Sequence, residues 1–277
     1  MDFLKVIKWL TYRSFVVRVA RAFHIQNFLE KVYYKVMRPK GGKIRISVKE
    51  IEADFYVDRS DELRLVEVIG CSRGGEHRLL ELLISLCQPG DIVYDIGASI
   101  GTHTIFLAKR LGEYGRVIAF EPEKQSYERL QSNIELNHLN NITVFQVALG
   151  EEEGEGVLHE SEGLGTYSLM VPYNEAKENT ESSVKIIRGD LLRKIENLPI
   201  PKVVKIDVEG YEYSVIQGLR ETFSQNSCKV VCCEIHPKLL PKNIGFKEIA
   251  TLMSSLGFTR IEINQRLGGF HAIWYKE

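Results

Sequence analysis

No stretch of this 277-residue sequence is long and apolar enough to span a membrane. The longest run without Asp, Glu, Lys or Arg covers residues 136–150 and contains three Asn, a His, a Thr and a Gln. A transmembrane helix needs about 20 apolar residues. We also expect no secretory signal peptide, because Lys5, Lys8 and Arg13 interrupt the apolar residues near the N-terminus.

Cysteine is scarce, with five residues, and no two of them form a C-x-x-C pair. Cys232 and Cys233 are adjacent in an apolar run typical of a buried strand, so their side chains point to opposite faces and make a poor chelating pair. The histidines outside the motifs below show no metal-ligand spacing, so we predict no metal site. The cysteines are expected to be reduced, buried thiols of a cytoplasmic protein: Cys71, Cys87, Cys228, Cys232 and Cys233.

The net charge of −1 hides an asymmetry. Residues 1–50 contain 12 basic and 3 acidic residues, whereas the remainder contains 24 and 34. Such a basic arm either binds a phosphate-rich or membrane surface, or docks on the acidic body. Trp9, Tyr12 and Phe15 favour peripheral membrane contact through residues 1–40, but the basic side chains do not gather on one helical face. Both interpretations stay open.

Amino-acid composition and a Pro- and Gly-containing break define the domain organisation. Apolar residues make up 44% and charged residues 26%, which excludes a disordered chain, a collagen-like chain and a coiled-coil rod. Pro39-Lys40-Gly41-Gly42 separates a basic helical arm, 1–42, from a small β extension, 43–72, whose apolar residues alternate as in a hairpin. The main domain, 73–277, begins with a Leu-rich helix near 75–87.

From Asp91 onward, short Val- and Ile-rich runs alternate with helical stretches. This pattern predicts a doubly wound α/β fold with a mainly parallel, seven-stranded sheet. The last two runs are separated only by a turn around Gly268-Gly269 and should pair as an antiparallel hairpin. Residues 150–190 interrupt the alternation, and we interpret them as an insertion beside the ligand cleft. The predicted strands are 92–96, 116–120, 142–147, 202–207, 229–235, 259–263 and 271–275.

The strongest motif, residues 93–102, joins a buried strand, a glycine-rich turn and a helix start. Gly97 permits a tight turn, and Gly101 permits close approach of the backbone to a ligand. The G-x-x-x-G spacing is neither the dinucleotide fingerprint nor the phosphate-binding loop, which argues against a nicotinamide-dependent oxidoreductase. Asp95, before the first glycine, disfavours a pyrophosphate and suits a cationic ligand.

Glu121 ends the next predicted strand, 26 positions after Asp95. In a doubly wound fold, a carboxylate at this position accepts hydrogen bonds from both hydroxyls of a ribose. The alternative is that Glu121 only caps the helix that follows.

Three titratable residues follow the ends of two later strands. Asp207 and Glu209 are two positions apart and share one face if the strand continues, and His236 ends the fifth strand. Because ligands bind at the carboxyl ends of parallel strands, the three side chains should converge on one site. The alternatives are a helix cap for Asp207, a structural role for Glu209 and a satisfied loop histidine for His236.

Together these motifs resemble the S-adenosylmethionine-dependent methyltransferases and, more closely, the FkbM family. The resemblance covers about residues 75–236. One departure is Ser99, where the family often has Asn. The matching stretches are Asp91–Thr102, Phe120-Glu121-Pro122, Asn133, Val147-Ala148-Leu149-Gly150, Val204–Glu212 and Glu234-Ile235-His236.

The resemblance implies a class I, Rossmann-like methyltransferase fold and S-adenosyl-L-methionine as the cofactor. It implies that the glycine turn passes under the methionine part of the cofactor, with Asp95 near its amino group. Glu121 would hold the ribose, and Val147 with Ala148 would flank the adenine. The implied cofactor-binding residues are therefore Asp95, Gly97, Ala98, Ser99, Gly101, Glu121, Val147 and Ala148.

The implied reaction is O-methylation of a hydroxyl on a sugar, a glycan or a related small molecule, with Asp207, His236 and Glu209 as catalytic residues. His236 suits the base, because its unperturbed pKa is near neutrality. Asp207 suits the base, an orienting group or a cation ligand. Two alternatives remain: a non-catalytic S-adenosylmethionine-binding module tethered to a membrane or glycan-assembly complex, and methylation of RNA, against which the acidic body argues.

Overall fold

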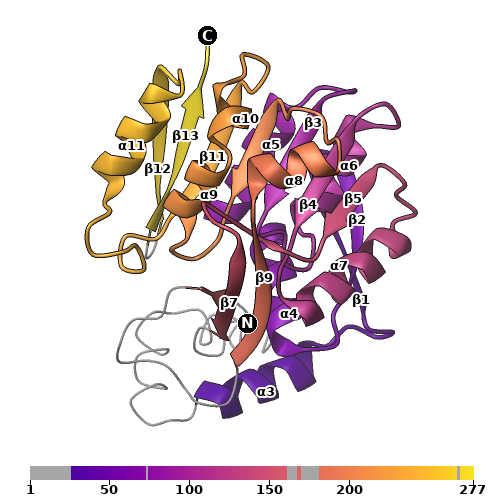
Figure 1. Cartoon of the computed structure of the whole chain (residues 1–277). Helices are drawn as coiled ribbons and strands as arrows, with labels where there is room; N and C mark the ends of the chain where they lie inside the picture. Colours follow the sequence, from indigo (N-terminus) through magenta and orange to yellow (C-terminus); the bar gives the residue numbers. More distant parts are fainter. Residues whose placement is uncertain (1–25, 73, 161–166, 170–180, 267–268) are drawn as a thin grey trace.

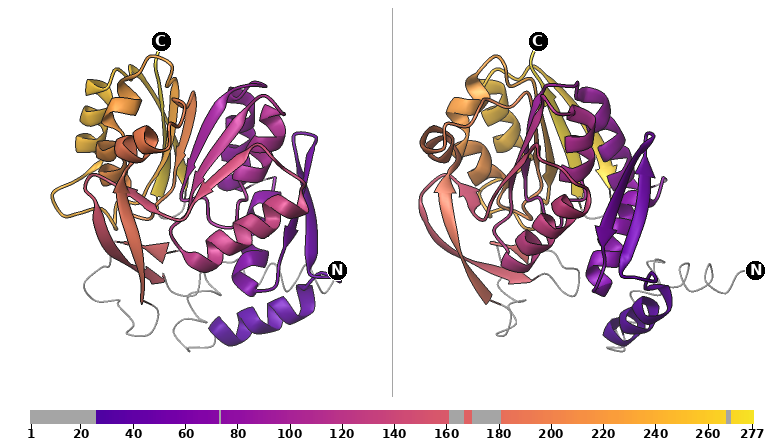
Figure 2. Two further views of the ribbon diagram at one scale, coloured as in Figure 1. Left: turned by 45° about the vertical axis from the view of Figure 1, so that its right-hand side comes forward. Right: turned by 90° about the vertical axis from the view of Figure 1, so that its right-hand side faces the viewer.

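The computed structural model describes residues 26–72, 74–160, 167–169, 181–266 and 269–277. Its centre is a seven-stranded sheet in the order β12-β13-β11-β10-β3-β4-β5. Figure 2 shows the molecule from two further directions. Five strands are parallel, and β13 lies antiparallel between β11 and β12. The predicted sheet and terminal hairpin are confirmed. The strands are β3 (Ile92–Ile96), β4 (Arg116–Phe120), β5 (Ile142–Phe145), β10 (Val203–Ile206), β11 (Val230–Ile235), β12 (Arg260–Arg266) and β13 (Gly269–Tyr275).

Helices cover both faces of this sheet (Figure 1). The central strands are buried throughout, as expected for strands packed on both sides. On one face Leu80 and Phe106 belong to the same apolar cluster as Val93, and on the other Ile216 and Met253 belong to a cluster with Val204. The helices that follow the hairpin along the chain are α5 (Gly75–Leu86), α6 (Thr104–Leu111), α7 (Lys124–Leu136), α8 (Gly189–Ile195), α9 (Glu212–Gly218), α10 (Arg220–Ser224) and α11 (Phe246–Ser255).

The predicted N-terminal hairpin is present as β1 (Lys43–Val48) paired with β2 (Ile51–Tyr56). It does not stand apart, because Phe55 is fully buried in the main apolar cluster and stacks on Phe106 with ring centroids 6.1 Å apart. The remainder of the predicted β extension is instead a helix, α4 (Ser60–Gly70). Of the predicted basic arm, the structure describes α3 (Gln26–Met37), and residues 1–25 lie outside the described residues.

The predicted insertion contributes to a second, four-stranded sheet in the order β6-β9-β7-β8. Its strands are β6 (Ala148–Gly150), β7 (Gly154–Glu160), β8 (Tyr167–Ser168) and β9 (Glu181–Arg188). The antiparallel pair β7 and β9 projects from the α/β body toward the side where α3 lies (Figure 1). Residues 161–166 and 170–180 lie outside the described residues.

The prediction that the side chains of Cys232 and Cys233 point to opposite faces of a buried strand is confirmed. Cys232 packs in the apolar cluster on one face of the sheet and Cys233 in the cluster on the other. All five cysteines are free thiols, and four are buried, whereas Cys71 is exposed. In the described part of the chain, no helix combines the length and the apolar character needed to cross a bilayer.

Candidate active site

A cavity of about 450 Å³ opens at the carboxyl ends of β3, β4, β10 and β11, within the usual size range of ligand pockets. Five carboxylates and two basic side chains line its described wall, so its electrostatic potential favours a cation. The predicted residues that line it are Gly97, Ala98, Ser99, Glu121, Val147, Ala148, Asp207 and Glu209. Asp95, Gly101 and His236 are not among the lining residues.

The turn after β3 is shaped by backbone packing. Gly97 has a φ of +78°, and a Cβ atom there would lie 1.9 Å from the carbonyl oxygen of Asp207. Only glycine allows the turn to pack this tightly against the segment after β10. Ser99 adopts a φ of +50° and donates its backbone N–H to Oε2 of Glu121 at 2.7 Å. The two loops that hold Asp207 and Glu121 are therefore both fixed by this turn.

Gly101 follows the same turn but does not line the described cavity. Its φ is +89°, and a Cβ atom there would lie 2.5 Å from Cδ1 of Leu130 on α7. The positive φ therefore favours glycine, and the Leu130 side chain on α7 would have to shift to admit a Cβ atom.

The carboxylate of Glu121 is held at the cavity wall by two backbone donors, Ser99 N at 2.7 Å and Glu123 N at 2.8 Å. Burial raises the pKa of Glu121 to about 7, although these hydrogen bonds act in the opposite direction. The capping alternative is excluded, because Glu123 is the N-cap of α7 and accepts hydrogen bonds from Gln125 N and Ser126 N. Each Glu121 oxygen retains a lone pair for a hydroxyl donor.

Lys205 is a site residue that the sequence analysis missed. Its ammonium group lies 3.2 Å from Oδ1 of Asp95, its neighbour across β10 and β3, and donates to the carbonyl oxygen of Gly97 at 3.1 Å. Burial alone would lower the pKa of Lys205, but the attraction of Asp95 and Asp207 raises it above its usual value. A single lysine within the apolar strand Val203-Val204-Lys205-Ile206 was the available signal.

Asp95 lies beneath the cavity floor. It is fully buried, its Oδ2 accepts a 2.6 Å hydrogen bond from Thr104 Oγ1, and its Oδ1 faces Lys205. Asp95 therefore contacts Lys205, which lines the cavity, and does not line the cavity itself.

Asp207 and Glu209 both face the cavity. Burial raises the pKa of Asp207 to about 6, with a further contribution from the nearby charge of Glu234. Burial likewise raises the pKa of Glu209 to about 7. Asp207 lies 3.6 Å from the Lys205 ammonium, measured from Oδ2 to Nζ. Two carboxyl groups thus titrate near neutrality at the expected position of an acceptor.

His236 lies behind these carboxylates. Its Nδ1 contacts Oε1 of Glu212 at 2.6 Å, and its Nε2 contacts Oε1 of Glu234 at 2.9 Å and Oε2 of Glu209 at 3.4 Å. Burial would lower the pKa of His236, but the hydrogen bonds to Glu212 and Glu234 raise it to about 11. Both ring nitrogens therefore contact carboxylates, an arrangement that suits orienting Glu209 and Glu234. The role of His236 as the general base stays a prediction.

Comparison of this chain with known proteins finds one matching family and several similar proteins. The Methyltransferase FkbM domain matches residues 95–260, more than half of the chain. The hexuronic acid methyltransferase AglP of Haloferax volcanii is 30% identical over 172 residues, which cover 61% of this chain and 66% of that protein. Methyltransferase 1 of Beauveria bassiana is 27% identical over 201 residues, which cover 64% and 78%. Among solved structures, M. jannaschii TYW2 in complex with AdoMet covers 86% of this chain with a TM-score of 0.44 and 15% identity.

Proposed function

Because this chain belongs to the FkbM family of S-adenosylmethionine-dependent methyltransferases, we propose that it methylates a hydroxyl group of a sugar or glycan. The observation that carries the proposal is the pair Asp207 and Glu209, which face the cavity with pKa values of about 6 and about 7. The archaeal relative is named a hexuronic acid methyltransferase, which supports a carbohydrate acceptor.

The cavity fits the cofactor of this family. Glu121 offers a fixed carboxylate to the ribose hydroxyls, and the turn from Gly97 to Ser99 lines the cavity where the methionine part would lie. Val147 and Ala148 supply the wall for the adenine. The excess of carboxylates favours a sulfonium ion, whose positive charge activates its methyl carbon for in-line displacement when the cofactor is bound.

In the proposed mechanism the chain aligns the acceptor and removes its proton. Asp207 or Glu209, in its ionised form, accepts the hydroxyl proton, a contribution typically worth about 10²–10⁴-fold in rate. Lys205 fixes the Asp207 carboxylate, and the imidazolium of His236 fixes Glu209. Holding the acceptor oxygen in line with the methyl carbon supplies the rest of the rate enhancement.

Calorimetry and an acceptor screen test the proposal. We expect S-adenosylmethionine and S-adenosylhomocysteine to bind with micromolar affinity and NADH not to bind. Glu121→Ala should weaken cofactor binding by about 10²-fold or more, because each hydrogen bond to a charged group contributes roughly 1.5–3 kcal/mol. Glu128→Gln, on the exposed face of α7, is the matched control and should bind as wild type.

The acceptor is sought by mass spectrometry among monosaccharides, uronic acids and oligosaccharides incubated with S-adenosylmethionine. Asp207→Asn or Glu209→Gln should lower turnover by about 10²-fold or more while the cofactor affinity stays within about threefold. Full turnover in both variants would remove the two carboxylates from the mechanism. Methyl transfer to RNA with none to any hydroxylated sugar would overturn the acceptor class.

A further inference from the structure

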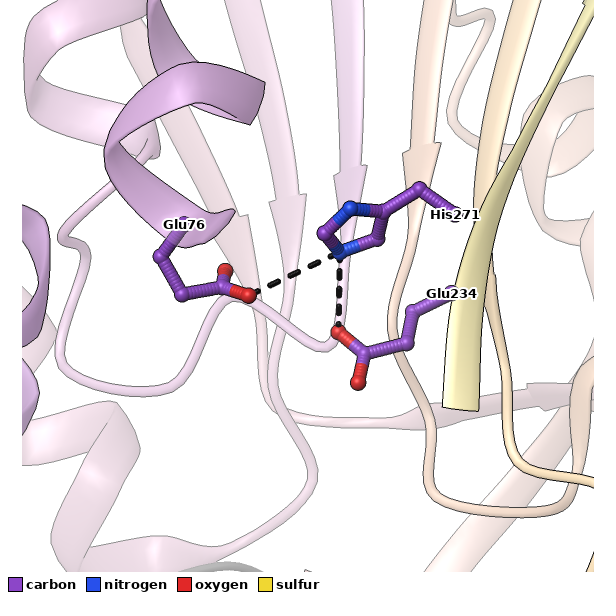
Figure 3. A group of neighbouring side chains, drawn as sticks. All are labelled: Glu76, Glu234 and His271. Carbon is purple, nitrogen blue, oxygen red and sulfur yellow. Dashed lines mark hydrogen bonds and ion pairs between the residues drawn. The ribbon is translucent and has the colours of Figure 1, made fainter. Parts of the chain in front are cut away.

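A second cluster of ligating side chains lies at the back wall of the cavity. Glu76 comes from the first turn of α5, Glu234 from β11 and His271 from β13, and Glu234 and His271 are direct partners across the β11–β13 pair. Figure 3 shows Nε2 of His271 directed at both carboxylates. We propose that Glu76, Glu234 and His271 bind a divalent transition-metal ion of the Zn²⁺ or Mn²⁺ type, a function beyond the proposed methyl transfer.

The spacing of the donor atoms supports a metal ion. Nε2 of His271 lies 3.3 Å from Oε2 of Glu234 and 3.5 Å from Oε1 of Glu76, and one ligand atom from each residue falls within 4.8 Å of the others. A charge-assisted N–H···O hydrogen bond is shorter, about 2.7–2.9 Å. Tetrahedral ligands bound at about 2.0–2.1 Å from one ion are about 3.4 Å apart. The observed distances fit the second geometry, and the 3.3 Å contact from His271 to Glu234 also qualifies as a long hydrogen bond, so a metal ion would replace the proton on Nε2.

His103 gives an independent indication of a cation. Its side chain is 6% exposed, and among the described residues its Nε2 has no hydrogen-bond partner. The nearest acidic atom is Oε2 of Glu76, 3.9 Å away. A buried imidazole nitrogen without a hydrogen-bond partner is energetically costly. His103 lies outside the group of donor atoms that fall within 4.8 Å of one another, so it is not a direct ligand. A water molecule bound to an ion beside Glu76 would give its Nε2 a hydrogen-bond partner.

The other grouping of metal-binding residue types, Asp207, Glu209 and His236, is a weaker candidate. Both ring nitrogens of His236 already make short contacts, at 2.6 and 2.9 Å, to Glu212 and Glu234. A metal ion there would have to displace a well-bonded proton. Glu76 and Glu234 line the cavity, so an ion bound by them would face the space where an acceptor enters.

The test is metal binding by the purified full-length protein, with no acceptor present. After treatment with a chelator, titration with Co²⁺ should give one site per chain with the visible absorption of a tetrahedral or five-coordinate ion. Zn²⁺ or Mn²⁺ at about 100 times its Kd should raise Tm by roughly 5–10 °C. Glu76→Gln and His271→Gln should each weaken binding by about 10²-fold or more.

Glu128→Gln is the control, because it removes an exposed carboxylate that belongs to neither grouping and should leave Co²⁺ affinity and absorption unchanged. Loss of binding in Asp207→Asn or Glu209→Gln with retention in Glu76→Gln would place the ion at the other cluster and overturn the proposal. Absence of any site in wild-type protein that unfolds cooperatively would also overturn it, with a proton on His271 as the occupant. Neither outcome bears on the proposed methyl transfer, which is measured separately.

Discussion

At the scale of single residues, the cavity holds two carboxyl groups that titrate near neutral pH. If Asp207 or Glu209 is the general base, kcat/KM should be low near about pH 5, rise about tenfold per pH unit and level off above about pH 8. A pH–rate profile of wild type, Asp207→Asn and Glu209→Gln checks this. The variant whose residual activity no longer depends on pH identifies the base, and a flat wild-type profile would contradict base catalysis.

The same carboxyl groups affect stability in the opposite direction. Their pKa values are raised in the folded state, so the fold holds protons that the unfolded chain has released. Their contribution to stability is complete below the unfolded values, near about pH 4, and is lost as the pH rises through about 6 to 7. Above about pH 7, where Asp207 and Glu209 are ionised as the proposed mechanism requires, the free protein therefore lacks this contribution to its stability.

Lys205 shows how strongly the site depends on one buried charge. Lys205→Met should lower the free energy of unfolding by about 3–5 kcal/mol, because it leaves Asp95 buried opposite an apolar side chain. Urea unfolding followed by circular dichroism measures the change. Lys185→Met, an exposed lysine on β9, should change stability by less than about 0.5 kcal/mol. Equal stability of the two variants would contradict the argument that Lys205 compensates the buried Asp95 side chain.

At the scale of elements, the turn after β3 contacts both the segment that carries Asp207 and the loop that carries Glu121. Gly97→Ala should destabilise the protein strongly and impair both cofactor binding and turnover, because its Cβ would displace the Asp207 backbone. Gly90→Ala is a matched control with a φ of +88° and open space around its Cβ, so it should cost only about 1–2 kcal/mol. Thermal unfolding of both variants separates backbone strain from the clash, and similar Tm values would contradict the packing argument.

The succession of strands and helices along the chain was predictable from the sequence, but the position of β13 in the sheet and the contacts between side chains were not. Alternating apolar runs and the short terminal turn were sufficient to predict the main sheet, and strand ends correctly located Glu121, Asp207 and Glu209 at the cavity. Glu76 and His271 were missed because they come close only through the insertion of β13 beside β11. Lys205 was missed because a lysine in a strand is usually exposed.

Helix α4 was missed for a different reason. Its buried residues Leu63, Val66 and Ile69 recur every three positions, a helical period that was available in the sequence. The preceding hairpin pattern was extended over them instead. Gly101 likewise has a contact that the sequence did not indicate, because its Cα side faces Leu130 on α7.

At the scale of the whole molecule, the N-terminal hairpin and the α/β body share one core. Phe55→Ala should lower the free energy of unfolding by about 3–5 kcal/mol and keep a single cooperative transition, since Phe55 is fully buried against α6. Chemical denaturation monitored by both tryptophan fluorescence and circular dichroism measures this. Two separate transitions in the wild type would show instead that the hairpin unfolds on its own.

The position of β13 also has a consequence for biosynthesis. This strand follows the other six along the chain, yet it lies between β11 and β12. While the ribosome is still translating residues 269–275, β11 has an open edge that is liable to pair with another nascent chain. Completion of the sheet is therefore a late step, and the chain should depend on chaperones until its C-terminal strand emerges. His271 arrives with that strand, so the back wall of the cavity also forms last.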